Sequence, residues 1–408
     1  SDWSSDVCSS DLITAKSVKG KMKVSNIGRT TIQNIDYTLS LNGRELESKH
    51  YVFPQALGHN DDAVVEVDVP PYTELGEDEL VFTITKVNGG RNGATISYAN
   101  LPRITVTKVP KRRIAVEEYT AMWCRYCPTG IALMENLSHT FGDDFVGIAV
   151  HVDDPLTCWD YYSKAKGNRF PTVDMNRSHK LGYVLGVDEF KAEQEAGADM
   201  DLEVSAVWDE SKNNITVTPV VTFRVNRDEA PYGFAYVLTE DGMTDSRWVQ
   251  NNAYSGSHGD RGVTKEFDEI IDSPGEIHNL KNNFVAIAAE GVNVPVTGHV
   301  EAPIKADTPL NHSYVFKDIN SKKVIQKKEN LRVCVLLINT QTRHVENAAK
   351  CVISEPKATG ISSVSDGTRS EVVVGRYTLD GRRITTPQRG INIVRYSDGR
   401  VSKEVVTR

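Results

Sequence analysis

The sequence predicts a multidomain chain in which an α/β domain is flanked by two all-β sandwiches and followed by a small β module. Short alternating strands separated by turn residues fill residues 13–108 and again residues 201–355. Strand and helix patterns alternate between them, over residues 109–200, as they do in α/β domains. The chain, at 408 residues, is long enough for roughly two to four domains of ordinary size.

Residues 1–12 precede this pattern and fit neither a fold nor a signal peptide. The segment SDWSSDVCSSDL has no apolar period, and it lacks the basic start and apolar core of a secretory signal. We therefore expect a non-native or disordered leader, with the native N-terminus and any signal peptide or lipid anchor missing, so that Cys8 carries no information. Residues 13–108 follow, and their rhythm of strands and Asn-Gly turns is typical of an immunoglobulin-like β-sandwich.

The α/β domain begins after a stretch rich in proline and charge at residues 109–113. An amphipathic helix is expected to start at Cys124 and end at Phe141, because apolar residues recur every four positions within it. The nearly continuous apolar run at residues 145–152 is typical of a strand that is buried on both faces. The other expected elements are strands at residues 113–119 and 170–175 and a closing helix at residues 188–195.

The C-terminal part, residues 356–408, is expected to be a linker and a small β module. It opens with a spacer rich in serine and glycine, and three short strand patterns follow. Three strands make a thin core, so we expect this module to lean on its neighbour.

Composition narrows the classes of partner. The formal net charge of −8 argues against nucleic acid, because that binding depends on clusters of Lys and Arg that neutralise phosphates. No apolar run approaches the roughly 20 residues that cross a bilayer. We therefore expect no transmembrane segment, and any membrane association would need an anchor or a partner. Nothing in the sequence indicates a cofactor or a metal.

Cys124 and Cys127 stand three residues apart at the expected start of a helix, on the same side of its first turn. This spacing allows a disulfide with little backbone rearrangement. Backbone N–H groups and the helix dipole would stabilise a thiolate on Cys124 and lower its pKa below the reference of about 8.5. Cys124 is then the expected nucleophile, and Cys127 the residue that resolves the mixed disulfide.

Two other interpretations of the Cys-x-x-Cys pair remain open. A zinc site needs a second pair of ligands, and no second Cys-x-x-Cys or His-x₃₋₅-His motif accompanies it. A structural disulfide needs only the two cysteines. The redox interpretation is favoured by its context, a strand before the pair, an amphipathic helix after it and a Phe-Pro-Thr strand start 44 positions beyond Cys127.

The segment YTAMWCRYCPTG resembles the active site of the thioredoxin superfamily, and Pro171 in Phe170-Pro171-Thr172 resembles its cis-proline. The family's buried acid, six positions before the first cysteine, corresponds to Glu118. The resemblance implies that Glu118 takes a proton from Cys127, and the alternative is a strand-end carboxylate in solvent. Arg125-Tyr126 replaces the usual Gly-Pro, which leaves the direction of electron transfer open. The expected substrate contacts are Trp123, Arg125, Tyr126 and Phe170.

Residues 113–355 more widely resemble a thioredoxin-like family of Bacteroidetes envelopes, named after a twenty-eight-kilodalton outer-membrane protein. The segment VCVLLINTQTRHVENAAKCVIS is similar to its closing hairpin, and YTLDGRRITTPQRGINIVRYSDGRVSKEVV is similar to cell-surface sorting modules. The resemblance implies export to the periplasm, outer membrane or cell surface. It also implies a thiol–disulfide oxidoreductase that meets protein thiols or disulfides and a redox partner in the envelope. The competing class is a non-enzymatic surface or binding protein with a structural disulfide.

Cys334 and Cys351 lie on the two arms of that expected hairpin. A turn centred between Thr342 and Arg343 would place the two cysteines directly opposite each other, where Cβ atoms of paired strands lie about 4.5–5.5 Å apart. A cross-strand disulfide is then feasible. The alternative is a pair of buried thiols, and a turn of different length would remove the pairing.

Overall fold

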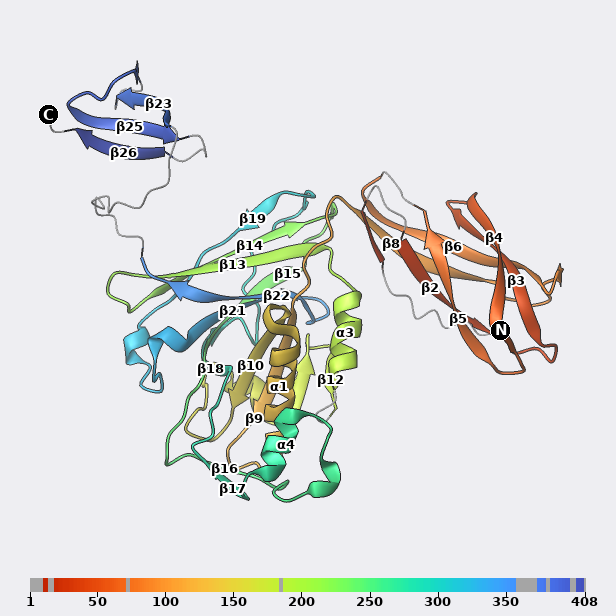
Figure 1. Cartoon of the computed structure of the whole chain (residues 1–408), viewed down its shortest axis with the longest axis horizontal. Coiled ribbons are helices and arrows are strands. Elements are labelled where there is room, and N and C mark those ends of the chain that lie inside the picture. The colour runs from red at the N-terminus through yellow and green to blue at the C-terminus, as the bar shows by residue number, and fades with distance from the viewer. Residues whose placement is uncertain are drawn as a thin grey trace. The chain divides into compact units, whose positions relative to one another are not determined.

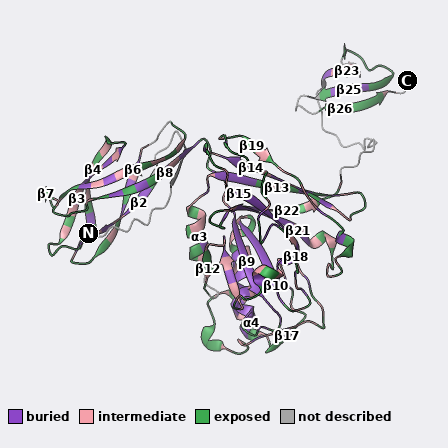
Figure 2. Ribbon diagram, turned by 180° about the vertical axis from the view of Figure 1, so that it is seen from behind, coloured by how far each residue is buried: buried purple, intermediate pink, exposed green. Residues whose placement is uncertain are grey.

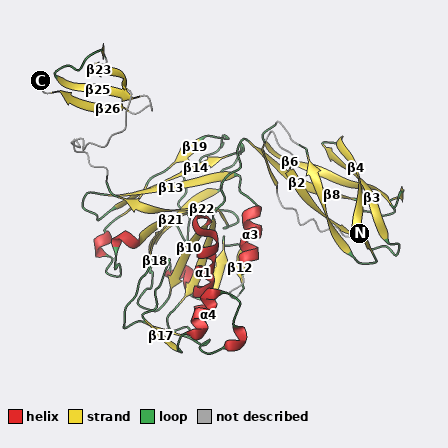
Figure 3. Cartoon of the chain, in the orientation of Figure 1, coloured by secondary structure: helices red, strands yellow, loops and turns green. Residues whose placement is uncertain are grey.

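The computed structural model describes residues 10–13, 18–70, 74–182, 186–356, 373–378, 382–396 and 401–406. Over these ranges strands outnumber helices and form several sheets, which confirms the prediction of a β-rich multidomain chain (Figure 1) (Figure 3). The chain divides into two compact units, residues 1–356 and 357–408. Cys8 and residues 357–372 of the expected linker lie outside the described residues.

The N-terminal module is built from two antiparallel-rich sheets around one core. One sheet has the order β1-β8-β6-β3-β4, with β7 beside β6, and the other pairs β2 with β5. Leu39 and Phe82 of the large sheet share this core with Val67 of the small one. The strands are β1 (Ser10–Ile13), β2 (Val18–Ser25), β3 (Ile32–Leu41), β4 (Arg44–Leu57), β5 (Asp62–Val69), β6 (Gly76–Val87), β7 (Gly90–Arg91) and β8 (Tyr98–Val106).

Strand β1 corrects the expectation that residues 1–12 lie wholly outside the fold. Residues 10–13 run parallel to β8, with Ser10 opposite Arg103 and Ile13 opposite Val106. Sheet pairing uses backbone N–H and C=O groups, which every non-proline residue carries, so a segment without an apolar period can still add a strand.

A twelve-stranded mixed sheet organises the middle of the chain, in the order β12-β11-β9-β10-β18-β15-β21-β22-β13-β14-β19, with β20 also on β14. Its central strands are buried along their whole length (Figure 2). The strands are β9 (Ile114–Thr120), β10 (Phe145–His151), β11 (Thr172–Met175), β12 (His179–Leu181), β13 (Met200–Trp208), β14 (Ile215–Phe223), β15 (Tyr232–Glu240), β18 (Val285–Glu290), β19 (Pro309–Asn311), β20 (Tyr314–Phe316), β21 (Leu331–Asn339) and β22 (Val345–Ser354).

This sheet runs across the boundary expected at residue 200. Strand β10 pairs in parallel with β9 on one side and, at one position, with β18 on the other, so segments before and after that boundary share one ladder. Asn347 of β22 reinforces the link: its side chain accepts a hydrogen bond from Arg113 N at 2.9 Å and donates to Lys111 O and Met200 O. The α/β segment is therefore continuous with the strands that follow it.

Two helices cover one face of this sheet. These helices are α1 (Pro128–Phe141) and α3 (Val187–Glu195). Leu133 and Leu137 of α1 and Phe190 of α3 pack on Ile114 and Val116 of β9. The opposite face carries α2 (Tyr162–Ala165). A further helix, α4 (Lys265–Asp272), and the strand pair β16 (Val249–Asn251) and β17 (Glu276–His278) belong to an insertion between β15 and β18.

Helix α1 begins four residues later than the sequence predicted. Cys127 is its N-cap and Pro128 its first residue, where a missing N–H costs no hydrogen bond. Cys124 lies in the preceding turn, in which Cys124 N donates to Ala121 O and Cys127 N to Cys124 O. The expectation of a helix from Cys124 was wrong, because these hydrogen bonds from each residue to the third residue before it form turns and not the α-helical pattern.

The expected pairing of Cys334 with Cys351 is wrong. Asn339 N donates to His344 O, which centres the turn one residue earlier than expected, and a β-bulge at Leu337 and Ile338 then shifts the register. Cys334 lies opposite Lys350, and both cysteines are free thiols. Because neighbouring strand positions point to opposite faces, Cys334 packs in the core on one side of the sheet and Cys351 against the core on the other.

The C-terminal module is a four-stranded antiparallel sheet in the order β24-β23-β25-β26. The sequence predicted three strands, and the added one is the two-residue β24. Residues 379–381 and 397–400, which include the Asp-Gly positions of the sorting-module resemblance, lie outside the described residues. The strands are β23 (Val373–Thr378), β24 (Arg383–Ile384), β25 (Gly390–Tyr396) and β26 (Val401–Val406).

Candidate functional site

Cys124 and Cys127 form a disulfide at the start of α1, with their Cα atoms 5.4 Å apart. The turn that carries them follows directly on β9, so the buried sheet fixes where the pair sits. Cys124 keeps 6% of its surface exposed and Cys127 none. Cys124 is therefore the one of the two cysteines that keeps any exposed surface.

Glu118 lies in the core behind the first turn of α1. Strand β9 alternates its side chains, so Glu118 shares the helix-covered face with Val116 while Glu117 points to the other face. Glu118 is 1% exposed, and its Oε1 has no hydrogen-bond partner among the described residues. Burial raises the pKa of this carboxyl to about 7.

Gly130 explains how a carboxyl fits beneath the helix. A Cβ at this position would overlap Glu118 Oε1 and lie 3.2 Å from Pro171 Cβ. The absence of a side chain thus brings the acid, the first turn of α1 and Pro171 together. The interpretation of Glu118 as a solvated strand-end carboxylate is wrong, because the helix covers it.

Pro171 stands where the sequence placed it. The Phe170–Pro171 bond is cis, and β11, which starts at the next residue, runs antiparallel to β9. Phe170 packs against the small apolar cluster of Ala121, Cys124 and Cys127. The segment therefore borders the cysteine pair, as predicted.

The residues expected to contact substrate form an exposed rim. Trp123 is 49% exposed and Tyr126 50%, and Arg125 between the cysteines is also exposed. Trp123 meets Phe170 edge to face at 5.5 Å, and its Nε1 donates to Val152 O, which fixes the indole in place. Trp123 and Phe170 therefore form an aromatic border close to Cys124, and Arg125 adds a charge to the rim.

The insertion after β15 holds the cysteine loop, and sequence reasoning missed it. Gln250 of β16 is buried, and its Nε2 donates to Cys124 O at 3.0 Å and to Asn251 O at 2.9 Å. Backbone bonds extend the contact, from Asn251 N to Met122 O and from Ala253 N to Arg125 O. The polar segment VQNNA carried no spacing signal that could have indicated this contact.

The same insertion covers the outer side of α1. Phe267 and Ile271 of α4 pack on Ala132, and Tyr254 meets the ring of Tyr126 at 6.3 Å. Tyr126 is thus bordered by a residue far from it in sequence. The rim of the site combines the cysteine loop, the segment at Pro171 and this insertion.

A buried histidine and carboxylate brace the other end of the loop. His151 Nδ1 lies 2.7 Å from Asp154 Oδ2, and the same oxygen accepts from Met122 N. These contacts give the pair a structural role. Cys158 is buried as well, and burial raises the pKa of its thiol to about 11, so it stays protonated near neutral pH.

Within the described ranges, no group of three or more His, Cys, Asp or Glu side chains is arranged to hold a metal. None of the helices in those ranges is long and apolar enough to span a membrane.

Comparison with known proteins identifies no family for the chain. No family model matches it, and neither does a curated protein. Among solved structures, HBP35 of Porphyromonas gingivalis is similar at 15% identity over 73% of this chain and 99% of its own, with a TM-score of 0.44. A domain of the outer membrane lipoprotein Omp28 from the same organism is similar at 11% identity over 39% and 92%, with a TM-score of 0.21. A protein of Agrobacterium tumefaciens matches at 15% identity over 63% and 99%, with a TM-score of 0.32.

Replacing Gln250 tests whether the insertion positions the cysteine loop. In Gln250→Leu the carbonyl of Cys124 loses its side-chain donor, and we expect unfolding to become easier by about 1–3 kcal/mol. Amide exchange at residues 122–125 should accelerate in the same variant. Gln341→Leu, at an exposed hairpin turn, is the matched control. Unchanged exchange in Gln250→Leu would contradict the positioning role.

Proposed function

We propose that the chain is a thiol–disulfide exchange protein of a bacterial envelope, in which Cys124 and Cys127 carry the electrons and Glu118 accepts a proton. The observation that supports this most is the buried Glu118 carboxyl behind the first turn of α1, whose Oε1 has no hydrogen-bond partner among the described residues. A buried carboxyl oxygen without a partner is costly in a core, and such perturbed groups collect at functional sites. A purely structural disulfide needs no such acid.

The elements around the pair support a thioredoxin-like arrangement. Parallel strands β9 and β10 flank the chain that forms α1, the cysteines stand at its start, and a cis-proline precedes the antiparallel strand β11. These features belong together in the thioredoxin-like interpretation of the sequence. The likenesses to solved structures have TM-scores below 0.5 and add no argument to it.

The proposed cycle has two displacement steps. The Cys124 thiolate attacks one sulfur of a substrate disulfide, so that a mixed disulfide forms and one substrate thiolate leaves. Cys127 then gives its proton to the Glu118 carboxylate and attacks Cys124 Sγ, which releases the second substrate thiolate. The two electrons of the dithiol reduce the substrate, and the cysteines end as a disulfide. The reverse sequence would donate a disulfide, and the direction of transfer stays open.

The proposed compartment is the periplasm, outer membrane or cell surface. A disulfide between Cys124 and Cys127 is compatible with such an oxidising environment. The proposed partners are protein thiols or disulfides and a redox protein of the envelope.

A non-enzymatic scaffold with a static disulfide is the second candidate. The deep burial of Cys127 and the hydrogen bonds that hold the loop favour it. A very low reduction potential together with no exchange activity would support this alternative.

Reduction of insulin by dithiothreitol, followed by turbidity, tests the proposed exchange. The full chain should shorten the lag, and Cys124→Ser should remove the acceleration entirely because the attacking thiolate is lost. Cys158→Ser, which removes a buried thiol with a raised pKa, should retain it. An unchanged lag with the native chain would reject the exchange activity.

The protonation of Glu118 predicts a pH dependence with a definite sign. The pKa of Glu118 is raised from 4.5 to about 7 in the folded state, so the folded protein binds this proton more tightly than the unfolded chain does. The stability that protonation adds is therefore lost as pH rises from about 4.5 to 7. Glu118→Gln should therefore gain stability relative to the native chain over this range, by roughly 2–4 kcal/mol. Denaturant midpoints at pH 5 and pH 8 measure the difference.

The same variant should slow resolution by Cys127 roughly a hundredfold above pH 7, where the native carboxylate is the base. Asp174→Asn is the matched control. Burial raises the pKa of the Asp174 carboxyl to about 6, and Asp174 lies opposite Glu117 in the sheet. Equal resolution rates in the native chain and Glu118→Gln at pH 8 would exclude Glu118 as the acceptor.

A further inference from the structure

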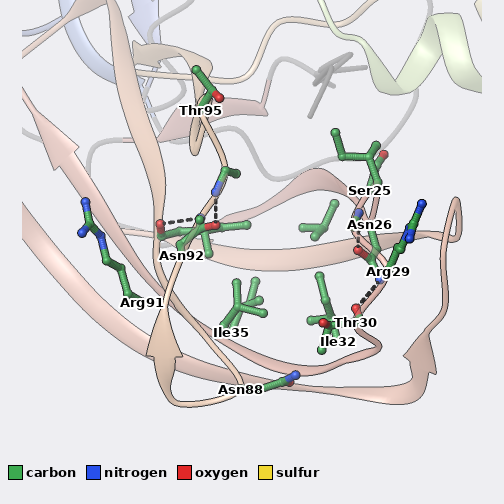
Figure 4. Close-up of a pocket in the computed structure, with 17 residues that line it drawn as sticks. Ser25, Asn26, Arg29, Thr30, Ile32, Ile35, Asn88, Arg91, Asn92 and Thr95 are labelled. Carbon is green, nitrogen blue, oxygen red and sulfur yellow. Dashed lines mark hydrogen bonds between the residues drawn. The ribbon is translucent and has the colours of Figure 1, made fainter.

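The N-terminal module holds a cavity of about 600 Å³ at one end of its core (Figure 4). Among the described residues the small sheet consists of β2 and β5, and β2 ends at Ser25. The end of the core is therefore left open between residues 24–30 and residues 87–95. Val24, Ile35 and Ile84 form an apolar floor.

Three asparagines hold the walls of this cavity in place. Asn26 donates to Thr30 O and Leu57 O and accepts from Gly28 N. Asn88 accepts from two backbone N–H groups of β3 and donates to Thr31 O. Asn92 donates to Ile84 O and accepts from Ala94 N. The loops around the opening are thus fixed by side chains whose polar groups are already used.

Two arginines in the lining, Arg29 and Arg91, do not hold the walls through side-chain hydrogen bonds. Arg29 and Arg91 are exposed, and neither guanidinium has a hydrogen-bond, ion-pair or ring partner in the part of the chain that the structure describes. The labelled view places the two side chains on opposite sides of the lining (Figure 4). The described residues that line the cavity include no Asp or Glu, although the whole chain has a net charge of −8.

We propose that this cavity binds an apolar molecule that carries one carboxylate. The apolar part would contact the isoleucine and valine floor, which removes it from water. The carboxylate would lie at the opening, where the positive charges of Arg29 on one side and Arg91 on the other attract it. A cavity of this volume is of ordinary size for a small ligand, and fixed walls reduce the entropy lost on binding. A neutral or cationic ligand would leave both guanidinium groups unmatched.

Titration of the full chain with hexanoate, octanoate and decanoate tests this proposal. Affinity should rise about three- to fourfold for each added methylene, because each buries further apolar surface. Octan-1-ol, which lacks the charge, should bind about tenfold more weakly than octanoate. Methyl spectra should shift at Ile32, Ile35 and Ile84, and not at isoleucines of the twelve-stranded sheet.

Arg29→Gln and Arg91→Gln should each weaken octanoate binding several-fold and leave octan-1-ol binding unchanged. Arg44→Gln, at an exposed position of β4 outside the cavity, is the matched control. Equal affinity for octanoate and octan-1-ol, no change in either arginine variant, or shifts confined to another part of the chain would each overturn the proposal.

The carboxylate can come from a fatty acid or from the end of a peptide, and one comparison separates these sources. Acetyl-Ala-Ala-Ile with a free C-terminus is titrated beside its amide and beside decanoate. Tighter binding of the free-acid peptide than of decanoate assigns a peptide terminus, and the reverse order assigns a fatty acid. Binding of the amide as tight as that of the acid contradicts the carboxylate requirement.

Discussion

The buried ion pair between Glu117 and Arg177 is the interaction on which the centre of the molecule depends. Both oxygens of Glu117 accept from the guanidinium at 2.7 Å, and Tyr161 OH donates to the same carboxylate. Burial opposes this charge, yet Arg177 holds the pKa of Glu117 below its usual range. Removing one partner of such a pair costs about 3–5 kcal/mol. Glu118, the next residue of β9, points to the opposite face of the sheet.

The contrast between these adjacent acids gives the site its chemical character. Glu117 is matched by Arg177 and stays charged, whereas Glu118 has no arginine or lysine among the causes that shift its pKa, and burial raises that pKa to about 7. The surrounding strands are buried in a sheet that continues beyond residue 200, and Glu118 is 1% exposed. The insertion that carries Gln250 fixes the other side of the cysteine loop. The disulfide of Cys124 and Cys127 and the Glu118 carboxyl are thereby held in one frame.

Local chemistry could be predicted from the sequence, and long-range placement could not. The spacing of Cys124 and Cys127 and the Phe170-Pro171 segment indicated neighbours that the structure brings together. The contact from Gln250 joins residues 126 apart and depends on no local pattern. The pairing of Cys334 failed because one bulge changes which residues face each other, and nothing in the local alternation specifies a bulge. The boundary at residue 200 was predicted from a change in the pattern of strands and helices along the sequence. That pattern does not show whether strands before and after the change join the same sheet.

Trapping of a mixed disulfide tests the central claim most directly. In Cys127→Ser the resolving thiol is absent, so Cys124 should react with glutathione disulfide and retain one glutathione. The account predicts that mass mapping locates this adduct on Cys124, with Cys158, Cys334 and Cys351 unmodified in the folded protein because burial keeps their thiols protonated. A folded Cys127→Ser protein that gains no adduct at Cys124, while the unfolded protein does, would contradict the account.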